Sequence, residues 1–105
     1  MNRMLASMEL LDEAAMDTLA LARACQRDAD WVQTRVTEGI FSPDAYAPGQ
    51  AGAQPRQWRF SCTTVVRARR VAQLERMFDA DPQLAAMTVD LMEEVLELRR
   101  RLGHR

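Results

Sequence analysis

Apolar residues recur at helical spacing through much of the chain, and short polar or proline-rich stretches separate the helical segments. The clearest break lies at Gly39, which can take the left-handed conformation that ends a helix without steric cost. Ile40 and Phe41 follow it and are expected to start a strand. Trp58 and Phe60 alternate with polar neighbours, which predicts a second strand with both aromatic rings on one face. The pattern predicts a helix, a small β wing and another helix.

Two short helices are expected before the wing. Asp17 or Thr18 can cap the first, which ends near Gln26, and Asp28 can cap the second. Apolar and polar positions of the second helix fall on opposite faces. Together the two helices predict a helix-turn-helix. Residues 1–16 give a weaker pattern, from which we expect a short strand around residues 4–11.

Two longer helices are expected after the wing. Ser61 can cap a helix over about residues 62–78, which is apolar on its buried side up to Phe78 and rich in arginine on its exposed side. Asp81 and Pro82 suit the start of a final helix that reaches Leu102. The proline- and glycine-rich residues 42–56 suit the loop of the wing.

The predicted fold class is therefore mainly α with a small β wing. All of it fits one domain, because a chain of this length is too short for a second core. Within that domain we expect an N-terminal extension over residues 1–16, a winged helix-turn-helix over residues 17–80 and a long C-terminal helix over residues 81–105.

The final helix carries apolar residues at alternating intervals of three and four, which is typical of a helix-packing seam. This apolar seam consists of Leu84, Leu91, Val95, Leu98 and Leu102. Homodimerisation and packing against the rest of the same chain require the same stripe. The sequence is compatible with either use.

A band of acidic residues lies beside the seam. This acidic band consists of Asp90, Glu93, Glu94 and Glu97, whose intervals of three, four and seven place them together on a helix. Such a band can dock on a basic partner helix. It can equally keep the helix solvated and form salt bridges with Arg100 and Arg101.

Composition narrows the function classes. The net charge is −1, and every one of the 14 basic residues is arginine. Cys25 and Cys62 have no CxxC spacing and no plausible metal partner, because the single histidine is His104, so we expect free, buried thiols in a reducing cytosol and no metal. Acidic residues interrupt the N-terminal segment too early for a secretory signal or a membrane span. A cytoplasmic protein is expected.

The sequence contains no recognisable set of catalytic residues. The chain has no GxSxG motif, no glycine-rich nucleotide loop and no evident carboxylate pair. We therefore expect neither an enzyme nor a cofactor.

Nucleic-acid binding is the alternative function that a winged helix-turn-helix suggests. Its contacts would come from a positive patch of Arg56, Arg59, Arg67, Arg69 and Arg70, to which Arg76 adds. The helix that would enter the groove carries three acids between Asp28 and Glu38 against the single Arg35, so the phosphates would repel it. The arginines are equally explained as a solvated face.

Six segments together resemble the bacterial chaperone-modulator family CbpM, whose fold is similar to the MerR-type winged helix. They are LARAC (residues 21–25), WV (31–32), EGIF (38–41), WRFS (58–61), RARRVAQL (67–74) and DLMEEVLELR (90–99). The resemblance extends from about Asp17 to Leu102. The chain differs from the family in the long wing loop, in the N-terminal extension and at Gln26, where a glycine is usual.

The resemblance implies a protein that binds the J domain of a DnaJ-like co-chaperone of the CbpA type and restrains both its work with DnaK and its DNA binding. J domains present a basic helix to DnaK, and the acidic band is our candidate for its contact. A small MerR-like DNA-binding regulator is the alternative. MerR-type regulators usually carry Arg-Tyr-Tyr where this chain has Gln33, Thr34 and Arg35, so the resemblance favours the modulator.

Overall fold

The computed structural model describes residues 15–46 and 54–103. Its elements are the helices α2 (Thr18–Ala24) and α3 (Ala29–Thr37), strand β1 (Ala45–Tyr46), the 3-10 helix η1 (Pro55–Gln57), strand β2 (Trp58–Arg59), and the helices α4 (Cys62–Phe78) and α5 (Pro82–Gly103). The mainly helical fold class is confirmed. The strand expected around residues 4–11 lies outside the described ranges.

The helices begin at the capping residues that the sequence predicts. Asp17, Asp28 and Ser61 each accept a hydrogen bond from a backbone N–H in the first turn of α2, α3 and α4. At α5 the Asp81 carboxylate accepts from the N–H of Gln83 at 3.0 Å. These side chains satisfy N–H groups that a helix leaves unpaired at its start.

Two residues with positive φ set the turns around α3. Gln26, between α2 and α3, has φ 60°, and Gly39, after α3, has φ 79°. A left-handed residue with a Cβ costs about 1 to 2 kcal/mol, whereas glycine pays no such cost. Gln26 therefore keeps the backbone conformation of a turn glycine despite its side chain.

The wing differs from its prediction. Ile40 and Phe41 do not form a strand, because the turn at Gly39 directs both side chains into the core, where they are buried. The first strand comes later, as β1, and pairs antiparallel with β2 so that Ala45 lies opposite Arg59. The prediction of a strand at residues 40–41 was wrong, while the pairing of two short strands is present.

The core lies where α2, α3, α4 and the segment around the β1–β2 pair meet. Its largest fully buried side chains include Phe60, Leu21 and Val71. The Phe60 ring packs edge-on against Phe41, with ring centroids 6.2 Å apart, and against Trp58 at 6.3 Å. These aromatic contacts pack β2 and the residue after it against the segment that follows α3.

Two buried positions were predicted wrongly. Phe78 is 68% exposed, because it is the last residue of α4 and the chain reverses at Asp79, which has φ 52°. Cys62 is exposed at the first residue of α4, whereas Cys25 is buried as expected. Both cysteines are free thiols.

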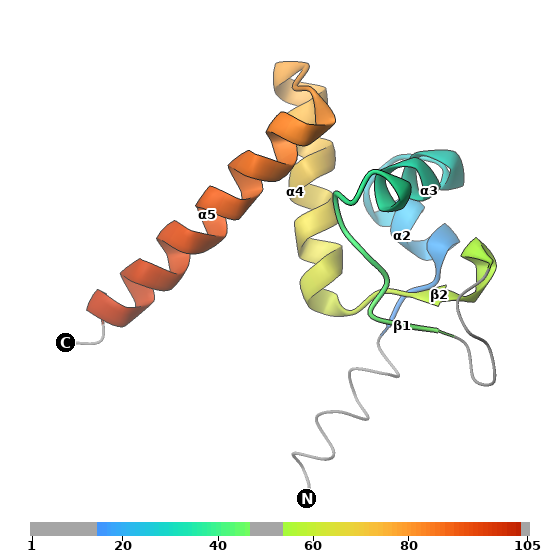
Figure 1. Cartoon of the computed structure of the whole chain (residues 1–105), viewed down its shortest axis with the longest axis horizontal. Coiled ribbons are helices and arrows are strands. Elements are labelled where there is room, and N and C mark those ends of the chain that lie inside the picture. Colours follow the sequence, from blue (N-terminus) through green and yellow to red (C-terminus); the bar gives the residue numbers. More distant parts are fainter. Residues whose placement is uncertain (1–14, 47–53, 104–105) are drawn as a thin grey trace, which may run out of the picture.

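Helix α5 slants away from α4, while α2, α3 and the strands gather on the other side of α4 (Figure 1). Only its first half contacts the core, through the buried Ala85, Ala86 and Val89. Beyond Val89 none of its described residues is buried. None of the described helices combines the length and apolar character that a transmembrane span requires.

Candidate functional site

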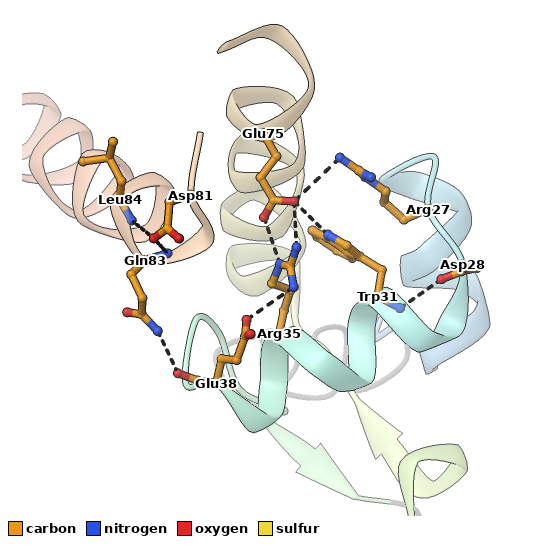
Figure 2. A network of polar contacts seen from close by, with 9 residues as sticks. All are labelled: Arg27, Asp28, Trp31, Arg35, Glu38, Glu75, Asp81, Gln83 and Leu84. Atoms are coloured by element: carbon orange, nitrogen blue, oxygen red, sulfur yellow. Dashed lines mark hydrogen bonds and ion pairs between the residues drawn. The ribbon is translucent and has the colours of Figure 1, made fainter. Parts of the chain in front are cut away.

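A buried carboxylate joins α4 to α3 and to the turn before it (Figure 2). The Glu75 side chain is 7% exposed. Its Oε1 accepts hydrogen bonds from Trp31 Nε1 at 3.0 Å and Arg35 Nη2 at 2.9 Å, and its Oε2 accepts from Arg35 Nε at 2.9 Å. Arg27 Nη2 lies 3.7 Å from Oε1. These four residues form the Glu75 network.

The Glu75 network is held by charge as well as by hydrogen bonds. The guanidinium groups of Arg27 and Arg35 lie over the Trp31 ring, 5.6 and 5.4 Å from its centroid. Burial by itself raises the pKa of Glu75, but the hydrogen bonds from Arg35 and Trp31 outweigh it, so the pKa falls below its usual value. The hydrogen bond to Glu75 in turn raises the pKa of Arg35.

The network changes what α3 can do. Arg35 is the single basic residue of α3, and it is engaged by Glu75 and by Glu38, whose Oε1 lies 3.3 Å from Arg35 Nη1. A guanidinium that holds a buried carboxylate is not available to a phosphate. The helix that would enter a DNA groove, α3, therefore has no unpaired basic side chain that could contact a phosphate.

The acidic band begins directly after Val89, the last residue of α5 that is buried in the core. Asp90 and Glu93 both face Arg67 of α4, with oxygens 2.8 and 3.5 Å from its Nη1. Arg67 also donates from Nε to the carbonyl of Ile40 at 2.9 Å. This one side chain therefore links α5 to α4 and to the turn after α3.

The other two residues of the acidic band differ from each other. Glu97 accepts hydrogen bonds from Arg100 and from Arg101 Nε, and these lower its pKa below the usual value. The predicted salt bridges to Arg100 and Arg101 are thus present, and they involve Glu97. Glu94 forms no hydrogen bond or ion pair with another residue in the described ranges.

The apolar seam is exposed in the single chain. Each of its five residues is at least 45% exposed. Leu91 and Val95 help to line an apolar hollow of about 340 Å³ on α5, together with Met92 and Leu96. Among the described residues, the seam is not used to pack α5 against its own domain.

The structure divides the predicted positive patch. Arg67 is taken up by acids of α5, and Arg59 donates from Nη1 to the carbonyls of Trp58 and Arg56. Arg69 and Arg70 lie elsewhere, beside the end of α2, where they line a hollow with Arg76. The arginines of the patch therefore differ in their contacts, because Arg67 and Arg59 are engaged within the chain and Arg69 and Arg70 line the hollow.

Sequence reasoning missed the Glu75 network. A signal was present, because Glu75 follows Ala68, Val71 and Ala72 at helical spacing and so falls on the buried side of α4. A carboxylate at such a position requires partners. Arg35 falls on the apolar face of the second helix, but no pattern in the sequence connects it to Glu75.

Two curated proteins are similar to the chain over 84 residues. The chaperone modulatory protein CbpM of Pseudomonas entomophila (strain L48) is 29% identical, and the match covers 80% of this chain and 76% of that protein. CbpM of Pseudomonas putida (strain W619) matches with the same identity and coverage. No family model and no solved structure matches the chain. Both relatives carry the name of the family that the sequence resembles, and their similarity supports the CbpM family for this chain.

Proposed function

We propose that the chain binds the J domain of a DnaJ-like co-chaperone of the CbpA type, and so inhibits its work with DnaK and its DNA binding. The names of its two relatives support a chaperone-modulating role. Such a role is non-enzymatic. The observation that supports the J domain most is the acidic band of α5, in which Glu94 is exposed and has no ion pair among the described residues.

Charge complementarity is the physical basis of the proposed contact. The J domain presents a basic helix to DnaK, and a neighbouring acidic helix attracts it and competes for it. Glu94 has no ion pair of its own among the described residues, and Asp90 and Glu93 share one guanidinium between them. The band therefore keeps negative charge available for a partner. Micromolar affinity, about 8 kcal/mol, suffices for a reversible modulator.

The α2–α3 pair and the β1–β2 wing are, in this proposal, a MerR-like winged helix-turn-helix that has become a protein-docking scaffold. The engagement of Arg35 by Glu75 favours this interpretation over DNA binding. So does the acidic Asp30 in the first turn of α3, which would meet the phosphates of a groove.

Reversing one charge of the acidic band tests the proposed contact. We expect Glu94→Lys to weaken binding to the J domain about tenfold at low salt, or by about 1.4 kcal/mol, because an attraction becomes a repulsion. The measurement is isothermal titration calorimetry with a purified CbpA-type J domain.

Asp30→Lys is the matched control, because Asp30 is also an exposed acid and its replacement makes the same change of net charge on a different helix. It is expected to leave the affinity nearly unchanged. Equal losses from both variants would assign the effect to net charge and not to the acidic band. If only Asp30→Lys weakened binding, the contact would belong to α3.

We also propose that the apolar seam joins two copies of the chain through antiparallel α5 helices. The acids of α5 lie over residues 90–97, and the basic Arg99, Arg100 and Arg101 follow. Antiparallel pairing places the acidic half of each helix opposite the basic end of its partner, whereas parallel pairing sets like charges together.

A further inference from the structure

A hollow lined by arginine lies beside α4, and none of the four residues of the Glu75 network lines it. It measures about 340 Å³ and lies between the end of α2 and the outer face of α4. Its basic side chains are Arg69, Arg70 and Arg76, and Gln73 contributes an amide. No acidic residue lines it. We call it the arginine hollow.

The positive charge of the arginine hollow is not balanced within the described part of the chain. Arg69 and Arg70 form no hydrogen bond or ion pair there, whereas Arg67 on the same helix is paired with acids of α5. Arg76 donates from Nη1 to the carbonyl of Cys25 at 3.0 Å, which positions its side chain without neutralising it.

Glu75, next to Arg76 in the sequence, and Cys25, in the lining of the hollow, do not supply the missing charge. Glu75 is engaged by Trp31 and Arg35 on the buried side of α4. Cys25 lies at the wall of the hollow, and burial raises the pKa of its thiol to about 11 against the opposing effect of the nearby arginines. The thiol is therefore protonated and neutral at physiological pH.

Three guanidinium groups around one small hollow suit a multiply charged anion. Guanidinium forks bind phosphate and carboxylate oxygens in pairs, and a phosphate ester carries about −1.5 to −2 charge near neutral pH. The volume is at the lower end of the range for small-molecule pockets, which is too small for a helix or a domain. A group with two phosphates would balance the three arginines.

We propose that the arginine hollow binds a small ligand bearing a diphosphate group. The site goes beyond the proposed function, because it involves neither the acidic band nor the seam. A ligand there would contact both α2 and α4, so its binding would stabilise the packing of these helices. The diphosphate could come from a free nucleotide or from inorganic pyrophosphate.

The test is calorimetric titration of pyrophosphate into the full chain. The salt concentration is kept at about 50 mM, because salt screens the charges of exposed side chains less at low ionic strength. We expect saturable binding at one site per chain. Arg69→Gln combined with Arg70→Gln should weaken it by about tenfold or more. Arg69→Gln alone, a milder change at an exposed residue, should weaken it in the same direction.

Arg100→Gln combined with Arg101→Gln is the matched control, because it removes the same charge from α5. It is expected to leave pyrophosphate binding within about twofold. Absence of saturable binding, or equal weakening by the two double variants, would overturn the proposal. A parallel titration with ADP identifies the source of the diphosphate. A higher affinity for ADP than for pyrophosphate indicates a nucleotide, and equal affinities indicate the free anion. Both results support the site.

Nucleic acid is tested in the same series. A short DNA duplex that binds more tightly than pyrophosphate, and that loses affinity in the Arg69→Gln/Arg70→Gln variant, would replace the small ligand by a phosphate backbone and so overturn the proposal. Neither result depends on J-domain binding, so this site and the acidic band can fail independently.

Discussion

Replacing Glu75 with alanine is expected to lower the free energy of unfolding by about 3 kcal/mol, since it removes the shared acceptor of Trp31 and Arg35. The loss leaves the largely buried guanidinium of Arg35 without its main counter-charge. Urea denaturation followed by circular dichroism measures the change.

Glu97→Ala is the matched control for this variant. Glu97 also accepts from two arginines, but on the exposed part of α5, where water competes for every partner. We expect no measurable change in stability. A Glu75→Ala variant as stable as Glu97→Ala would show that the Glu75 network does not hold α3 on α4.

The same carboxylate predicts a pH dependence. Because the pKa of Glu75 is lower in the folded chain than in the unfolded chain, the unfolded state takes up the proton first as the pH falls. The stabilisation is complete above the usual glutamate pKa of about 4.3 and is lost as the pH falls through the lower folded value. In a Glu75→Gln variant the free energy of unfolding should no longer contain the pH dependence that comes from Glu75, whereas the pH dependence from the other acidic residues should remain.

Introducing a charge into the apolar seam has the second large expected effect. If two α5 helices pair through the seam, Leu91→Asp buries a carboxylate at the contact and should raise the dimer dissociation constant by about 100-fold or more. The fold of each chain should survive, because Leu91 is 66% exposed. Sedimentation equilibrium measures the association, and circular dichroism checks the fold.

Leu19→Asp provides the control for the seam. Leu19 is 60% exposed on α2, so it undergoes the same substitution at similar exposure away from α5. It is expected to leave dimerisation unchanged. A wild-type chain that stays monomeric at high micromolar concentration, or a dimer that tolerates Leu91→Asp, would rule out the seam as the interface.

The local signals of the sequence predicted the helices well. Asp17, Asp28, Ser61 and Asp81 act through hydrogen bonds within one turn, so the sequence alone is sufficient to place them. The strand expected at Ile40 and Phe41 failed because burial in the core, a contact between distant segments, decides their conformation.

The sequence did not predict which side chains of distant helices contact one another. The acidic band was found from helical spacing, but its contact with Arg67 depends on how α5 leaves α4 at Asp79. The arginine hollow likewise requires the end of α2 to lie beside α4. Helical periodicity places side chains on a face but does not determine which segment that face meets.

Competition with DnaK tests whether this chain binds the basic surface of the J domain. The measurement is the ATPase activity of DnaK stimulated by a CbpA-type co-chaperone, in the presence of increasing amounts of this chain. We expect inhibition that excess DnaK relieves, because both proteins would bind the same basic surface of the J domain. Inhibition that excess DnaK does not relieve, or no inhibition at any concentration of this chain, would contradict it.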